Sequence, residues 1–82
     1  EDTLCAGGII SGLNDYNTIS DAAHIAKKLY ESSKNNILKE MMKSSHAKRL
    51  SSYDNILDIE FCSKLNTQPI IPILKEDFLT LL

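Results

Sequence analysis

Residues 44–49 bring two serines, a histidine, a lysine and an arginine into six consecutive positions. On a helix, His46 and Arg49 are three positions apart and share one face. The planar guanidinium of Arg49 suits phosphate or sulfonate, and the imidazole of His46 can donate or accept a proton near neutral pH. Ser44 and Ser45 add hydroxyls, and a helix that begins there presents free amides to an anion. The spacing indicates an oxyanion site, although a capped helix start with solvated charges explains the same residues.

The adjacent carboxylates Glu1 and Asp2 are the second group with possible chemistry. A carboxylate pair ahead of a glycine-bearing helix can hold Mg²⁺, which prefers oxygen ligands and often keeps several waters. Carboxylates also favour the positive end of an ordinary helix, so this signal alone leaves both interpretations open. The acidic residues of a third group do not converge well, and we interpret them as capping and solvation: Asp54, Asp58 and Glu60.

Composition limits the class of protein. The chain has 82 residues, enough for one domain, and 43% are apolar, which is typical of a folded protein. The net charge of −2 gives no general attraction to nucleic acid, and aromatic residues, at 6%, do not alternate with basic ones. No apolar run approaches the roughly 18 residues of a membrane span. We therefore expect neither nucleic acid nor a membrane as a partner.

Charge is distributed unevenly along the chain. Between positions 27 and 49 there are seven Lys or Arg residues against two acidic residues. Such a basic middle can face an anionic ligand, and a solvated helix face explains it equally. We expect His24 to lie on the surface or at the rim of the protein.

Cys5 and Cys62 each sit among apolar residues, and no CxxC spacing indicates zinc. We expect buried free thiols in a cytoplasmic protein, because the cytoplasm keeps thiols reduced. The first residue is not methionine and no basic segment of a signal peptide follows. We therefore expect the chain to be a piece of a longer protein.

Apolar periodicity predicts four to five short helices. The first covers residues 3–13 and contains Gly7, Gly8 and Gly12, which indicate either close packing against another backbone or a ligand, or a short, irregular helix. The second follows a cap at Thr18 or Ser20 and ends in a polar loop over residues 32–36. The third begins near Ile37, with Met41 and Met42 facing inward. The predicted caps of the last two helices are Ser45 for the fourth, and Asp54 or Asn55 for the fifth, which covers residues 56–65.

The end of the chain predicts a β-hairpin, with strands over residues 70–74 and 78–82 that are apolar on both faces. Pro72 has no amide donor, so its strand lies at a sheet edge or carries a bulge. Because a two-stranded hairpin is marginal alone, the rest of its sheet is expected elsewhere. The predicted fold class is α+β: a mostly helical lobe ending in a β-hairpin that completes a sheet with the missing part of the protein.

An ordered set of segments resembles the C-terminal part of the 2-phosphosulfolactate phosphatase family. These segments cover nearly the whole chain: Glu1-Asp2-x-Leu4-Cys5-Ala6-Gly7, Ser20-Asp21-Ala22-Ala23, Ser44-Ser45-His46-Ala47-Lys48-Arg49-Leu50, Asp58-Ile59-Glu60-Phe61-Cys62-x-x-Leu65 and Ile70-Ile71-Pro72-Ile73-Leu74. The family typically has glycine where this chain has Ala47.

The resemblance implies that residues 1–82 form a single lobe of a larger Mg²⁺-dependent phosphomonoesterase. Its reaction is hydrolysis of 2-phospho-3-sulfolactate, or a related phosphate ester, to sulfolactate and phosphate, a step of coenzyme M synthesis. The implied catalytic residues are Asp2 and His46, the implied substrate contacts are Arg49 and Ser45, and the implied metal ligands are Glu1 and Asp2. The expected partners are the small-molecule substrate and the remainder of the same polypeptide, with a homo-oligomer left open.

A non-catalytic helical interaction module is the alternative, with the basic middle or the Met41–Met42 face binding a partner. A phosphatase lobe should expose apolar surface where the missing lobe docks, and its sheet should be incomplete. A complete module should bury its hairpin and show no cleft around His46.

Overall fold

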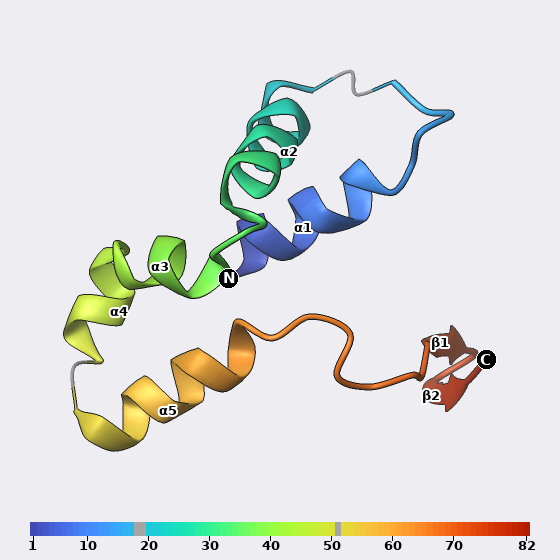
Figure 1. The fold of residues 1–82 in the computed structure, drawn as a ribbon. Helices are drawn as coiled ribbons and strands as arrows, with labels where there is room; N and C mark the ends of the chain where they lie inside the picture. The colour runs from blue at the N-terminus through green and yellow to red at the C-terminus, as the bar shows by residue number, and fades with distance from the viewer. Residues whose placement is uncertain (18–19, 51) are drawn as a thin grey trace.

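The computed structural model describes residues 1–17, 20–50 and 52–82. Within these residues the chain forms five helices and then two strands: α1 (Asp2–Ser11), α2 (Asp21–Ser33), α3 (Ile37–Met42), α4 (Ser45–Arg49), α5 (Tyr53–Cys62), β1 (Pro72–Lys75) and β2 (Phe78–Leu81). The hairpin of β1 and β2 stands apart from the helices at the end of a connection, residues 63–71 (Figure 1). The predicted α+β class is confirmed.

Helices α1 and α2 pack closely against each other, and Gly7 is the reason that they can. A Cβ atom at Gly7 would overlap the carbonyl oxygen of Ala26 and lie 2.8 Å from the Cβ atom of Tyr30. This confirms the predicted approach of a second backbone. Gly12 has another role, because it ends α1 as the C-cap residue with a right-handed backbone.

The core is small and lies where α1, α3, α4 and α5 meet. Its buried members are one residue from each of these helices: Leu4, Met41, Ala47 and Ile59. Partly buried residues pack around them: Leu29, Ile37, Leu38 and Leu50. Within the described residues no side chain is completely removed from solvent. Ala47 occupies the position where the resembling family typically has glycine, and its methyl group is a core contact here.

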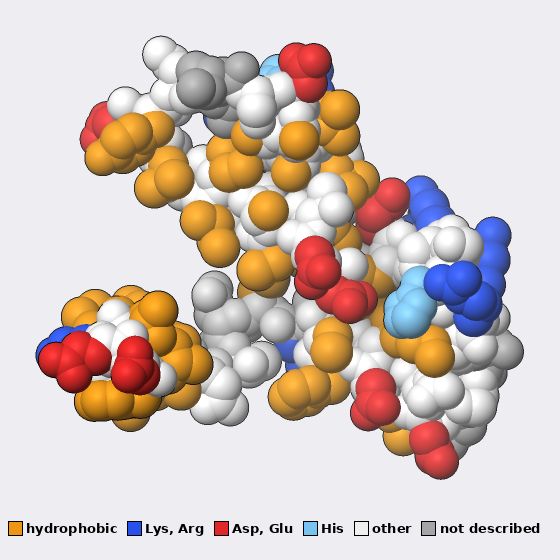
Figure 2. Space-filling view, turned by 180° about the vertical axis from the view of Figure 1, so that it is seen from behind, with side chains coloured by type: hydrophobic (Ala, Val, Ile, Leu, Met, Phe, Trp, Pro, Cys, Tyr) orange, Lys and Arg blue, Asp and Glu red, His pale blue; other side chains and the backbone are white. Residues whose placement is uncertain are grey.

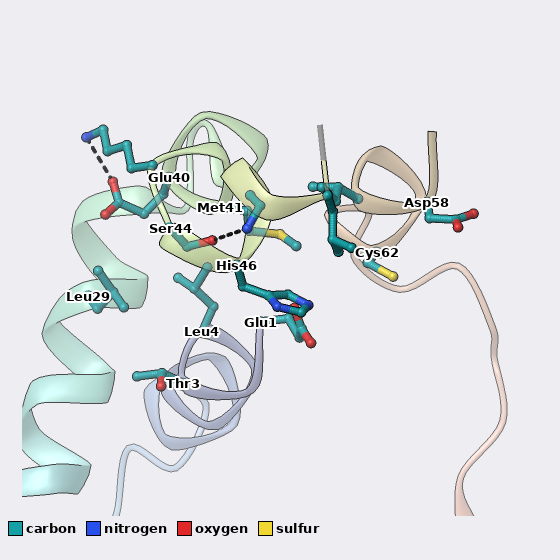
Figure 3. A pocket seen from close by; sticks show the side chains of 14 residues that line it. Glu1, Thr3, Leu4, Leu29, Glu40, Met41, Ser44, His46, Asp58 and Cys62 are labelled. Atoms are coloured by element: carbon teal, nitrogen blue, oxygen red, sulfur yellow. Dashed lines mark hydrogen bonds and ion pairs between the residues drawn. The ribbon is translucent and has the colours of Figure 1, made fainter. Parts of the chain in front are cut away.

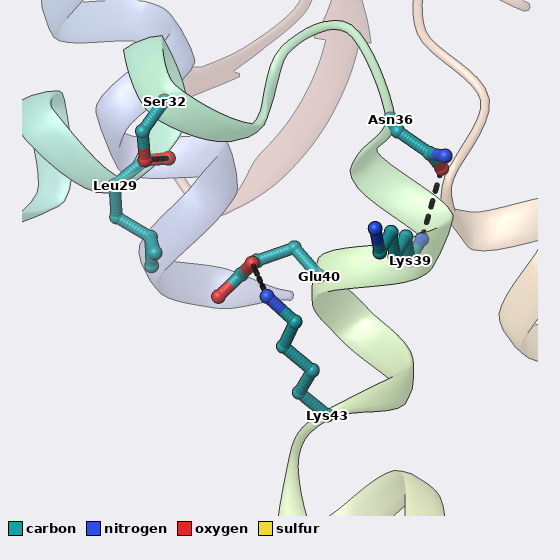
Figure 4. Close-up of polar contacts among 6 residues, drawn as sticks. All are labelled: Leu29, Ser32, Asn36, Lys39, Glu40 and Lys43. Atoms are coloured by element: carbon teal, nitrogen blue, oxygen red, sulfur yellow. Dashed lines mark hydrogen bonds and ion pairs between the residues drawn. The ribbon is translucent and has the colours of Figure 1, made fainter.

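Side-chain caps begin three of the helices. Ser20 Oγ accepts from the amide of Ala23 at 3.1 Å, and Asn36 Oδ1 accepts from the amide of Lys39 at 3.1 Å (Figure 4). Ser44 Oγ accepts from the amide of Ala47 at 3.0 Å. Each cap satisfies a helical N–H group that has no partner inside its own helix.

Two predicted caps were wrong, and one lies outside the described residues. Ser44 caps α4 instead of Ser45, because Ser44 has the extended backbone of a cap residue while Ser45 is already helical. Ser52 is the N-cap of α5, so the predicted caps Asp54 and Asn55 fall inside its first turn. Thr18, the alternative cap of α2, lies outside the described residues.

Other boundaries and burials also differ from the prediction. Helix α2 continues to Ser33, and α5 ends at Cys62 instead of residue 65. Cys5 and Cys62 are free but exposed, and Met42 is exposed as well. These three side chains do lie among apolar residues, which is why burial was predicted, but no described segment of the chain packs over them. His24 is exposed, as predicted.

The hairpin is antiparallel, with Pro72 opposite Leu81 and Leu74 opposite Leu79. Residues that face each other across such a pair share one side of the sheet. Leu74, Leu79 and Leu81 therefore form one wholly apolar side with Pro72, which we call the leucine face. The other side of the hairpin carries both apolar and polar side chains. The expectation that both faces are apolar is therefore confirmed for the leucine face alone. Among the described residues, no helix has the length and apolar content to cross a membrane.

Candidate functional site

A hollow of about 510 Å³ lies where the start of α1 meets α3, α4 and α5; we call it the first hollow (Figure 3). Core residues such as Leu4, Met41 and Ile59 form its apolar wall. Its polar lining comes from four helices and their caps: Glu1, Thr3, Glu40, Lys43, Ser44, His46 and Asp58. The first hollow therefore combines both charge signs and a histidine above an apolar base.

Glu1, at the start of α1, and His46, in α4, both line the first hollow. The backbone oxygen of Glu1 begins α1 by accepting from the amide of Cys5 at 2.9 Å. Its carboxylate makes no capping hydrogen bond within the described part of the chain. The side chains of Glu1 and His46 both face the hollow in Figure 3. The carboxylate of Glu1 is thus available to a ligand.

Arg49 lies beside His46, as their three-residue spacing predicted. The distance from Arg49 Nη2 to His46 Nδ1 is 3.5 Å. A guanidinium can only donate, so Nδ1 is the acceptor in this contact and the ring proton of a neutral His46 belongs on Nε2. The pair therefore leaves an N–H donor on His46 for a ligand.

The remaining predicted site residues lie outside the first hollow. Asp2 is exposed in the first turn of α1 and lines a second hollow, of about 750 Å³, between α1, α5 and residues 63–67. Glu1 lines both hollows. Ser45 and Arg49 are exposed on α4 and line neither hollow. The structure thus places Glu1 and His46 on the first hollow and Arg49 beside His46. Asp2 lines only the second hollow, and Ser45 lines neither.

The start of α4 shows the capped arrangement that the sequence left as an alternative. The amide of Ala47 is taken by Ser44 Oγ, and the amide of Lys48 donates to the carbonyl oxygen of Ser44 at 3.2 Å. Lysine and arginine side chains gather over α3 and α4 on one side of the helical body (Figure 2). Lys43 of this group forms an ion pair with Glu40 at 3.1 Å. An anion in this region would therefore be bound by charged side chains more than by unpaired backbone amides.

The sequence interpretation missed three charged residues of the first hollow: Asp58, Glu40 and Lys43. Asp58 had been assigned to solvation. Its position directly before the buried Ile59 was the available signal, because a side chain next to a buried helix position borders the packed surface. Glu40 and Lys43 were not singled out from the sequence as candidate site residues.

The first turn of α1 partly fits a divalent metal. Within the described residues, no group of three or more His, Cys, Asp and Glu side chains converges to hold an ion. Mg²⁺ is commonly held by one or two carboxylates, with waters and substrate phosphate filling the other positions. Glu1 and Asp2 are exposed neighbours, and the carboxylate of Glu1 is not used as a cap. Two carboxylates of this kind can supply part of such a coordination sphere.

Comparisons with known proteins agree with the resemblance. A family model described as 2-phosphosulpholactate phosphatase matches residues 1–77. The chain is 38% identical over 78 residues to a "Probable 2-phosphosulfolactate phosphatase" of Pseudothermotoga lettingae, covering 94% of this chain and 34% of that protein. A protein of the same name from Thermotoga maritima is 40% identical over 74 residues, covering 90% of this chain and 32% of that protein.

A cyanobacterial relative with the same name, from Synechocystis sp., is 33% identical over 76 residues, which are 88% of this chain and 32% of the relative. The chain thus spans about a third of the length of the curated relatives that it matches. No solved structure matches the chain.

Proposed function

The chain belongs to the 2-phosphosulfolactate phosphatase family, and on that premise we propose that it is one lobe of a phosphomonoesterase. The proposed reaction is hydrolysis of 2-phospho-3-sulfolactate, or a related phosphate ester, to sulfolactate and phosphate. Its proposed setting is cytoplasmic coenzyme M synthesis. The observation that carries the proposal is the first hollow, which Glu1 and His46 both line and at which Arg49 contacts His46.

The reaction asks more for positioning and charge neutralisation than for covalent help. A water oxygen forms a bond to phosphorus while the bond from phosphorus to the C2 oxygen breaks, and that oxygen gains a proton. His46 is suited to donate a hydrogen bond from Nε2 to the leaving oxygen, or, as an imidazolium, to give that oxygen a proton and become the neutral imidazole. Arg49 is suited to a two-donor contact with a phosphate or sulfonate group.

Two further residues complete the proposed roles of this lobe. Ser45 lies on the exposed start of α4, next to His46, and its hydroxyl is a further donor to the substrate. Asp2 is the candidate base, and Glu1 with Asp2 would hold Mg²⁺. When bound, Mg²⁺ neutralises phosphate charge and lowers the energy needed to form hydroxide from water. The other groups of the site are expected in the part of the polypeptide beyond this chain.

The non-catalytic module fits the structure less well. A complete module should bury its hairpin and lack a cleft at His46. Here the hairpin side chains are exposed, including Leu79 at 70%, and His46 lines a hollow. Both features agree with a lobe that is completed by more polypeptide.

The test is phosphate release by the full-length protein that carries this chain. We expect hydrolysis of 2-phospho-3-sulfolactate with added Mg²⁺, a loss of the rate with a chelator, and a lower kcat/KM for 2-phospholactate, which lacks the sulfonate. No release of phosphate from either ester would overturn the proposed reaction. Equal kcat/KM for the two esters would remove the sulfonate from the proposed recognition.

A further inference from the structure

This chain exposes far more surface than a compact protein of its size. Its accessible surface is 6941 Å², whereas a compact protein of 9.2 kDa exposes about 4,900 Å². Its radius of gyration is 14.8 Å, against about 11.7 Å for a compact chain of this length. The excess of roughly 2,000 Å² has the size of a substantial interface. Some of it lies on the hairpin, which stands clear of the helices in Figures 1 and 2.

The leucine face is largely exposed to solvent. Leu74, Leu79 and Leu81 are 71%, 70% and 62% exposed. All three lie on the same side of the two strands, because Leu74 is opposite Leu79 and Leu81 is opposite Pro72. No polar side chain interrupts them. A face of this composition is expected to be covered in the complete protein.

The two edges of the hairpin differ in what they offer to a further strand. The amide of Leu82 donates to the carbonyl oxygen of Ile71 at 2.9 Å, which fixes Ile71 and Leu82 as a hydrogen-bonded pair. Because such pairs alternate in an antiparallel ladder, the backbone groups of Leu79 and Leu81 point away from β1. On the other edge, Pro72 occupies an outward position and has no N–H to offer. The edge of β2 is therefore open, while the edge of β1 is blunted.

We propose that the open edge of β2 pairs, at Leu79 and Leu81, with a strand from the part of the polypeptide that the relatives carry and this chain does not span. The same part covers the leucine face. This proposal rests on the family assignment and the length of its members, not on the reaction. The chain spans about a third of each relative, so a segment roughly twice as long as this chain is available to do so.

A second copy of the chain is less suited to pair with β2 and to cover the leucine face. Exposed apolar side chains also line the second hollow, which no residue of the hairpin borders, including Ile9 and Phe61. One large covalently attached segment can cover the hairpin and this hollow together. A two-fold contact through the hairpin would bury the hairpin and leave the second hollow exposed.

Amide hydrogen exchange in the unsubstituted full-length protein, followed by NMR, tests the proposal without any variant that might misfold. We expect the amides of Leu79 and Leu81 to exchange at least about 100-fold more slowly than the amide of Leu74. Leu74 is the matched control, because its amide points outward from the blunted edge of the same hairpin. The measurement is made at a concentration where sedimentation shows a monomer.

Three results would overturn the proposal. Exchange of Leu79 and Leu81 as fast as that of Leu74 would show that no strand pairs with β2. Protection of Leu74 alone would place the sheet on the other edge. Protection that appears only in a dimer would assign the edge to a second copy. Because none of these results depends on phosphate release, failure here is distinct from failure of the proposed reaction.

Discussion

Replacing Gly7 with alanine tests the packing of α1 on α2, which sets where Glu1 lies. The added methyl group would overlap the carbonyl oxygen of Ala26 and lie 2.7 Å from its carbonyl carbon. Both atoms belong to the backbone, so the two helices must separate. Overpacking of this kind costs about 1–3 kcal/mol, and the better helix propensity of alanine returns about 1 kcal/mol. We expect Gly7→Ala to lower the free energy of unfolding by up to about 2 kcal/mol.

Gly12→Ala is the matched control on the same helix. Gly12 has φ −79° and ψ −11°, which alanine adopts freely, and the nearest atom to the added Cβ is Ile9 O at 3.4 Å. Such a substitution stabilises by about 0.4–1 kcal/mol, chiefly by restricting the unfolded chain. The assay is urea unfolding of the two full-length variants, followed by circular dichroism. The packing argument is refuted if Gly7→Ala is as stable as Gly12→Ala.

The remaining predictions concern the site and one cap. We expect His46→Gln to lower kcat of the full-length protein by about 100-fold, while the exposed His24→Gln leaves kcat unchanged; equal effects would remove His46 from proton transfer. Asp2→Asn should raise the Mg²⁺ concentration for half-maximal rate at least about tenfold, and Asp15→Asn in the exposed turn should not; a shared response would argue against ligation. Ser44→Ala should lower the free energy of unfolding by about 1 kcal/mol in a urea titration, since the amide of Ala47 loses its partner; no change would contradict the capping role.

Local patterns in the sequence were sufficient to predict the order of the elements. Periodicity located each helix, and the apolar runs around residues 76 and 77 located the hairpin. The choice between neighbouring caps was less certain, because Ser44 and Ser45 have the same side chain and differ only in backbone conformation. The burial of Cys5 and Cys62 was wrong because apolar spacing shows that a helix face is suited to being covered, not which segment covers it.

At the candidate site, too, local features were predicted from the sequence and features that depend on the packing of helices were not. The closeness of His46 and Arg49 follows from helix geometry and was predicted. Glu1 and His46 are 45 positions apart and line the same hollow because α1 packs against α3 and α4, which no local spacing encodes. Only the family resemblance grouped these residues. Asp58 was missed because its contribution depends on how α5 packs on the core at Ile59.

The central claim is that this lobe supplies a guanidinium and an imidazole to a phosphatase site. The most direct measurement is kcat/KM for 2-phospho-3-sulfolactate in full-length Arg49→Ala, compared with Lys48→Ala, its neighbour of equal charge on the same exposed helix. A lost charge-assisted contact is worth about 1.5–3 kcal/mol, so Arg49→Ala should lose at least about tenfold and Lys48→Ala should not. Unchanged kinetics in Arg49→Ala, or the same loss in both variants, would contradict the claim.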